Sequence, residues 1–221
     1  MAKLNCFITV SVTTLIAMTG VANAGYVHND PINNTDPTGR ECVSQTDGSA
    51  ICNPPGDDIG EFTIPANFEP SDVGPDQSGY HQYTASATTP DVNGSLGDAI
   101  ATEVANNPTP GSDLPATPEG SVNQALPGIE NSKVNSFTTT DANGNTVVVN
   151  VTIPGQHVLH PGYVAQAIIP GATSTSIKVV GEGNALIQVG PGSALGGAAF
   201  QHKINGDMRR AIYNSVANGS F

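Results

Sequence analysis

Two histidines three positions apart, His157 and His160, stand just before Pro161-Gly162 and are the first candidates for chemistry in this chain. Imidazole nitrogens bind transition metals, and His81 or His202 could supply a third ligand from farther away. On an extended strand, however, positions three apart point to opposite faces. We therefore expect a polar loop pair, and a small secreted hydrolase or metalloenzyme is kept as the second alternative function.

Asp141, Asn143 and Asn145 alternate like the first ligands of a calcium loop. The glycine comes at the fourth position instead of the sixth and no Glu follows at the twelfth, which excludes an EF-hand. The same Asp-Ala-Asn-Gly-Asn segment is typical of a hairpin turn. We expect a turn and no cofactor, with calcium as the one ion kept open. A secreted calcium- or carbohydrate-binding module is the first alternative function.

Of the three cysteines in the chain, Cys42 and Cys52 are predicted to form a disulfide. The first cysteine, Cys6, lies in a segment that we expect to be removed. Asp47-Gly48-Ser49 between the pair is a good turn, so the two thiols can meet across a small loop. Closing a loop this short would stabilise the folded chain by about 3 kcal/mol. The prediction requires an oxidising compartment.

The N-terminus is typical of a secretory signal peptide, residues 1–24. Lys3 precedes an apolar run over residues 6–18, and the segment ends in Ala22-Asn23-Ala24. We expect cleavage after Ala24 and a secreted or cell-surface protein, periplasmic or extracellular. No later window is long and apolar enough to span a membrane.

Charged residues are unevenly distributed over the rest of the chain. Residues 25–130 carry 16 of the 19 acidic residues, 13 of the 17 prolines and one base, Arg40. Residues 131–221 carry five bases and three acids. This acidity excludes a nucleic-acid binder that neutralises phosphates. We expect residues 25–130 to be largely irregular, with the disulfide loop, an edge strand at residues 62–64 and a short helix after Ser95.

Strand patterning is concentrated in residues 131–221, which we predict to form a small β-rich domain. Two strands around Asn143-Gly144, a strand over residues 163–169 and a hairpin over residues 176–189 are expected. They are followed by a short helix over residues 207–216, with Asp207 as its cap. The fold class is mainly β, sandwich-like or hairpin-rich. The strand residues considered for assembly between chains are Val147, Val149, Val151, Ile153, Ile177, Val179, Leu186 and Gln188.

Two short segments resemble parts of surface proteins. Residues 138–151, T-T-T-D-A-N-G-N-T-V-V-V-N-V, resemble a strand-turn-strand of bacterial immunoglobulin-like surface repeats. Residues 188–192, Q-V-G-P-G, resemble the core of a curlin repeat, of which the chain holds one fragment. Both resemblances imply a surface or fibre-forming protein.

Catalytic motifs are missing from the sequence: it holds no phosphate loop, no G-x-S-x-G elbow and no H-E-x-x-H pair. The leading hypothesis is therefore an exported, non-enzymatic cell-surface or extracellular-matrix protein with a structural or adhesive role. It would self-associate through strand pairing or bind other surface proteins or glycans.

Overall fold

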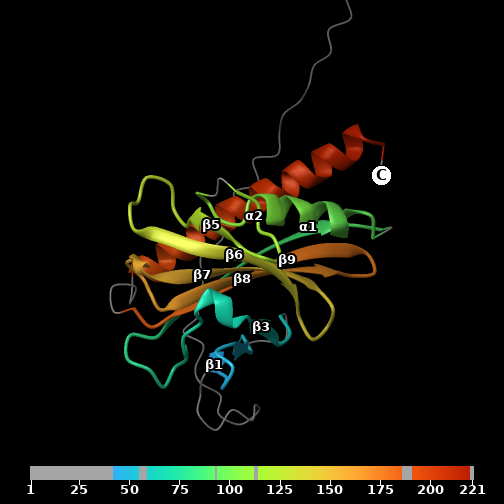
Figure 1. Ribbon diagram of the computed structural model, residues 1–221. Coiled ribbons are helices and arrows are strands. Elements are labelled where there is room, and N and C mark those ends of the chain that lie inside the picture. The colour runs from blue at the N-terminus through green and yellow to red at the C-terminus, as the bar shows by residue number, and fades with distance from the viewer. Residues whose placement is uncertain (1–41, 55–58, 93, 112–113, 186–190, 220–221) are drawn as a thin grey trace, which may run out of the picture.

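A six-stranded antiparallel sheet forms the centre of the molecule in the computed structural model (Figure 1). The structure describes residues 42–54, 59–92, 94–111, 114–185 and 191–219. In spatial order the strands are β4 (His81–Pro90), β9 (Ser174–Gly183), β8 (Gly162–Pro170), β7 (Thr146–His157), β6 (Ser132–Thr140) and β5 (Ser121–Gln124). The mainly β fold class with a C-terminal helix is confirmed.

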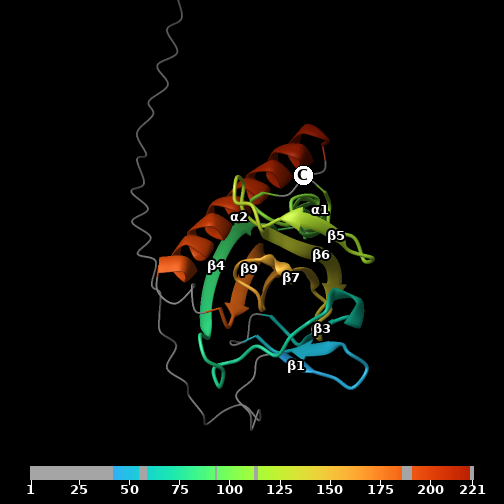
Figure 2. The same cartoon turned by 60° about the vertical axis from the view of Figure 1, so that its left-hand side comes forward.

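Each face of this sheet is covered by a different layer (Figure 2). Two helices, α1 (Leu96–Asn106) and α2 (Pro191–Ala217), pack on one face. The other face carries a small three-stranded sheet and a short 3-10 helix. These elements are β1 (Cys42–Ser44), β2 (Ala50–Cys52), β3 (Phe62–Ile64) and η1 (Ala66–Phe68).

Burial of both faces explains the run of valines in β7. Val147, Val149 and Val151 pack toward the small sheet, while Val148 packs toward the helices. The sequence suggested a polar second face because Asn150 and Thr152 alternate with the valines there. Both are buried, so this face is also part of the interior.

The disulfide predicted between Cys42 and Cys52 is confirmed. The two residues lie opposite each other in β1 and β2, because the turn at Asp47–Ser49 reverses the chain between them. The expected edge strand at residues 62–64 is β3, which pairs with β2. Phe62 and Ile64 point from it into the interior, so the disulfide-linked sheet closes the face of the large sheet that the helices leave open.

The expected boundary near residue 130 does not divide the described chain into a loose and a folded part. Strands β4 and β5 both precede residue 130, and β4 pairs along its whole length with β9. Several acids in this region serve as hydrogen-bond acceptors: buried Asp91 accepts from the Leu96 backbone N–H and from the Thr175 hydroxyl. Counting those acids only as charges made the region look less foldable than it is.

Two predicted elements have different lengths in the structure. The expected hairpin with a turn at residues 181–184 is wrong, because β9 continues through Gly181 to Gly183. Leu186 and Gln188, placed on its returning strand, lie outside the described residues. The expected helix at residues 207–216 is the last part of α2, which begins at Pro191. Three glycines in its first half conceal this helix, since glycine lowers helix propensity by about 1 kcal/mol.

A buried chain of polar contacts ties α2 to the sheet. Lys203 Nζ donates to Gln166 Oε1 and to Asp207 Oδ2, both at 2.7 Å. Gln166 Nε2 and Asn150 Nδ2 donate to the carbonyl of Pro108 at 2.7 and 3.0 Å. Burial lowers the pKa of Lys203 and raises that of Asp207, and their contact opposes both effects. Asp207, expected as a helix cap, is instead the counter-ion of a lysine inside the protein.

We expect Lys203→Met to lower the free energy of unfolding by about 3 kcal/mol, because it leaves the buried carboxylate of Asp207 and the amide of Gln166 without their ammonium partner. Urea denaturation of the full chain measures this loss. Arg210→Ala is the matched control: half of the Arg210 side chain is exposed, so its pairing with Asp207 should be worth less than about 1 kcal/mol. Equal losses for the two variants would contradict the assignment.

Candidate functional site

A cavity of about 180 Å³ lies between the large sheet and α2. The pairing register of the strands determines which residues form the floor of this cavity. One row across the strands consists of His81, Gly183 and Gly162, and the next contains Tyr83, Gly181 and Val164. Three of these six positions are glycine, so the sheet leaves space where side chains would otherwise meet the helix. The other lining residues include Val134, Asn150, Thr152, Leu126, Ile129, Gly196 and Phe200.

The two aromatic rings of β4 lie over glycines of β9. A Cβ at Gly181 would come within 2.2 Å of the Tyr83 ring, and a Cβ at Gly183 within 2.9 Å of the His81 ring. Gly196 of α2 lies on the Tyr83 ring as well, where a Cβ would approach to 2.9 Å. Glycine is required at these positions because any side chain would push the rings out of place.

The two cavity residues of β4 have polar atoms without internal partners. His81 Nδ1 lies 3.1 Å from the carbonyl of Gly79, which can only accept, so this nitrogen carries the proton. Burial lowers the pKa of His81 and raises that of Tyr83, which keeps both side chains neutral at pH 7. Within the described residues, neither His81 Nε2 nor the Tyr83 hydroxyl has a hydrogen-bond partner.

Apolar residues from two loops surround the cavity at the end of the sheet where β4 begins. Ile129, between β5 and β6, and Val158, between β7 and β8, both line it and are 44% and 54% exposed. The Val158 backbone N–H donates to the carbonyl of Asn131 at 3.0 Å, which joins the two loops. Leu126 and Leu159 line the cavity from the same loops. The rim of the cavity is therefore apolar and in part open to solvent.

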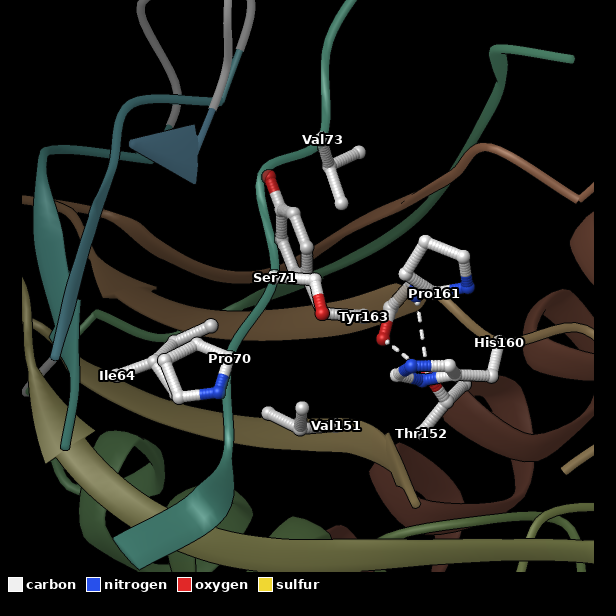
Figure 3. Close-up of a pocket in the computed structure, with 10 residues that line it drawn as sticks. Ile64, Pro70, Ser71, Val73, Val151, Thr152, His160, Pro161 and Tyr163 are labelled. Carbon is white, nitrogen blue, oxygen red and sulfur yellow. Dashed lines mark hydrogen bonds between the residues drawn. The ribbon is translucent and has the colours of Figure 1, made fainter. Parts of the chain in front are cut away.

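The candidate histidine pair lies in the turn between β7 and β8. The Leu159 backbone N–H donates to His157 Nδ1 at 3.1 Å, so neutral His157 carries its proton on Nε2. Thr152 Oγ1 donates to the carbonyl of Gly162, and therefore His160 Nδ1, 3.0 Å away, must donate to Thr152 (Figure 3). The lone pair of His157 is taken by the Leu159 N–H, so the two rings as arranged offer at most one nitrogen, His160 Nε2, and not the two that a shared metal needs.

No three His, Cys, Asp or Glu side chains within the described ranges are close enough to hold a metal ion. His81, considered as a third ligand, lines the cavity instead, and His202 is an exposed residue of α2. The small pocket beside His160 in Figure 3 measures about 10 Å³, room for at most one water molecule. The larger cavity is therefore the better candidate for a ligand.

The Asp141 side chain organises the β6–β7 turn. Its two oxygens accept from the backbone N–H groups of Asn143, Asn145 and Gly60 and from Asn145 Nδ2, all within 3.0 Å. Burial alone would raise the pKa of Asp141, but these hydrogen bonds outweigh it and lower the pKa. A carboxylate already surrounded by four N–H donors favours the hairpin turn over a calcium loop, and it also holds the segment before β3 on this turn.

The strands considered for assembly between chains lie inside the sheet. β7, with Val147, Val149, Val151 and Ile153, pairs with β6 and β8, and β9, with Ile177 and Val179, pairs with β4 and β8. Their backbone groups are therefore used within the chain. The long edge strand is β4, where Gln201 of α2 accepts from the Ser86 N–H at 3.3 Å and donates to its carbonyl at 2.8 Å.

Sequence analysis missed both His81 as a cavity residue and Tyr83. A usable signal was present, since His81, Tyr83, Ala85 and Ala87 alternate with polar residues and therefore share one face of a strand. The charge and proline content of residues 25–130 hid it. The glycines of β9 were also read as a turn, and only the pairing of β4 with β9 brings the two segments together.

No family model and no curated protein matches this chain. Among solved structures it is similar to the crystal structure of Ara h 8.0201, with 11% identity and a TM-score of 0.41 over 61% of this chain and 99% of that one. It also matches the di-domain ARO/CYC BexL from the BE-7585A biosynthetic pathway, with 14% identity and a TM-score of 0.23 over 63% of this chain and 46% of that one.

We expect His157 to make the protein less stable in mild acid. Burial, with a smaller effect from His160, lowers the pKa of His157 to about 4 in the folded state, against 6.5 for an unperturbed histidine. The unfolded chain therefore binds the proton first, so stability is full above pH 6.5 and falls as the pH drops toward 4, by on the order of 2 kcal/mol.

Thermal denaturation at pH 7 and pH 4.5 tests this linkage. His157→Gln should lose less stability between the two pH values than the wild type, because its amide does not titrate. His202→Gln, which changes an exposed histidine, should behave like the wild type. An unchanged pH dependence in His157→Gln would contradict the lowered pKa.

Proposed function

We propose that this chain is an exported, non-enzymatic protein that binds a small, largely apolar molecule in the cavity between the sheet and α2. The observation that carries the proposal is the cavity itself: about 180 Å³, with valine, leucine, isoleucine and phenylalanine among its lining residues and a partly exposed apolar rim. A cavity of about 150 Å³ lined by apolar side chains is large enough to hold benzene.

The composition of the cavity supports binding over catalysis. Acid-base catalysis needs a carboxylate or imidazole aimed at a reacting atom and a partner that orients it. The carboxylate of Glu182 accepts from the hydroxyls of Tyr80 and Tyr163, which occupies it in structural contacts. His157 accepts the Leu159 N–H at Nδ1, so it does not carry a free base nitrogen toward the cavity. His81 does present Nε2 there, but its Nδ1 is oriented by the neutral carbonyl of Gly79, and within the described residues no carboxylate pairs with it to strengthen it as a base.

Binding also replaces strand-paired assembly as the leading function. The strands proposed for assembly are paired on both sides, and Gln201 covers part of the exposed edge of β4. An adhesive or matrix role would have to use another surface, whereas the cavity needs no further element to hold a ligand. Calcium or glycan binding, the first alternative, would use the β6–β7 turn, where Asp141 is already saturated with N–H donors.

We expect toluene to bind the full chain and to raise its melting temperature, because a ligand that binds only the folded state stabilises it. Val164→Phe should abolish this rise, since it places a ring inside the cavity. Val122→Phe is the matched control, because Val122 is half exposed on β5 and does not line the cavity. Calorimetry and thermal shift measure both effects. No binding of toluene by the wild type would contradict the proposal.

Export is proposed from the N-terminal sequence and agrees with the disulfide of Cys42 and Cys52. The predicted signal peptide, residues 1–24, lies outside the described residues. Neither described helix has the length and apolar composition to cross a membrane. We expect the mature protein to begin at Gly25, which N-terminal sequencing or intact-mass analysis of the protein from its native cells would show. A mature chain that still begins at Met1 would contradict export by this route.

A further inference from the structure

The polar atoms that line the cavity restrict the chemical class of the ligand it can bind. This inference rests on the proposed function. His81 is more than nine-tenths buried, yet its Nε2 has no partner among the described residues. Because Nδ1 carries the proton and donates it to the carbonyl of Gly79, Nε2 has a lone pair and can only accept a hydrogen bond. Nε2 is not among the fully buried unpaired atoms of the described residues, and His81 lines the cavity, so a ligand there can donate a hydrogen bond to this nitrogen.

The Tyr83 hydroxyl is the second such atom. Tyr83 is partly buried and lines the cavity, and its hydroxyl has no hydrogen-bond partner within the described residues. It stays protonated because burial raises the pKa of Tyr83, and it can therefore donate. The cavity thus offers one acceptor, from His81, and one donor, from Tyr83.

Both atoms belong to residues of β4 that lie over glycines of β9 on the same side of the sheet. His81 Nε2 is 3.1 Å from the Cβ position of Gly183, and Tyr83 Oη is 2.6 Å from that of Gly181. The two Cβ positions are two residues apart on one strand, so about 7 Å separates them. A hydroxyl group on the ligand is the smallest group that can donate to the histidine and accept from the tyrosine.

The charges around the cavity argue against a ligand with a carboxylate, which is the most obvious alternative to one with a hydroxyl. No Lys or Arg is among the described residues that line the cavity, and Lys203, the buried lysine of the described chain, is used by Gln166 and Asp207. An anion would also meet the lone pair of His81 Nε2, and burying an unpaired charge is far less favourable than burying a hydroxyl.

We infer that the cavity binds a neutral alcohol or phenol, with a hydrocarbon body about the size of one six-membered ring and its hydroxyl placed between His81 Nε2 and Tyr83 Oη. The body is limited by the volume of about 180 Å³. The apolar rim at Ile129 and Val158 offers such a molecule an apolar route to the cavity.

Three probes of similar shape test this inference on the full chain: p-cresol, toluene and p-toluate. Calorimetry should give p-cresol at least a tenfold lower dissociation constant than toluene, and p-toluate should not bind measurably. Tyr83→Phe, which removes one oxygen atom, and His81→Leu should each reduce the preference for p-cresol over toluene severalfold while toluene still binds. His202→Leu, at an exposed histidine, should keep the full preference.

The outcomes separate the ligand class from the proposed function. If toluene and p-cresol bind equally well to the wild type, or if the preference survives both cavity variants, the hydroxyl site is wrong and the apolar cavity stands. Binding of p-toluate as tight as that of p-cresol would overturn the neutral class. If none of the three probes binds, the proposed function fails together with this inference.

Discussion

The contact between Lys203 and Gln166 determines how the C-terminal helix lies on the sheet, and most of the architecture on that face depends on it. Gln166 belongs to β8, one of the central strands, and its amide also binds the carbonyl of Pro108 from the connection between α1 and β5. A buried ammonium needs hydrogen-bond partners. Sliding the helix along the sheet would separate Lys203 from Gln166, whereas Asp207 lies on the same helix and would move with it. This requirement restricts the helix to one position, whereas apolar packing alone would allow several.

The position of the helix in turn creates the cavity. Lys203 lies about two turns beyond Gly196, so the contact with Gln166 brings Gly196 onto the Tyr83 ring. Toward α1, the sheet presents Val148, Ile168 and Ile177, which fill the space under the helices. Toward the start of β4, it presents glycines, and the space stays open. The same helix therefore closes an apolar core at one end and roofs a cavity at the other.

The parts of this fold that were predictable from the sequence are those determined by local chemistry. The turn at Asn143-Gly144, the strand over residues 163–169, the edge strand at residues 62–64 and the disulfide depend on nearby residues, and all are present. The helix after Ser95 is also present, although Asp91 and not Ser95 accepts from its first N–H. Of the candidate site, the sequence singles out His157, but as part of a polar loop pair, with a metal site as the alternative, and not as a residue of a cavity.

What sequence analysis could not supply depends on pairing between distant segments. Gly181 and Gly183 look like a turn until β4 is placed beside them, 98 to 102 residues away in the chain, where they accommodate the rings of Tyr83 and His81. Likewise, Lys203 reads as a surface charge and Asp207 as a helix cap until Gln166 is brought under the helix. Glycines, acids and single polar residues have several local uses, and only tertiary contacts select one of them.

The cavity is best understood as a feature retained despite its effect on stability. An empty space of this size forfeits packing, and substitutions that fill cavities commonly stabilise proteins. Unpaired polar atoms at His81 and Tyr83 add to the loss, because each could be replaced by an apolar residue of similar shape. Other polar side chains of the interior are well hydrogen-bonded: Lys203, Asn150, Gln166 and Asp141 each have several partners. Among the buried side-chain atoms of the described residues, Asn184 Oδ1 also lacks a partner, away from the cavity. The contrast between the well-paired groups and the two cavity atoms supports the proposal that these atoms and the space beside them serve a ligand.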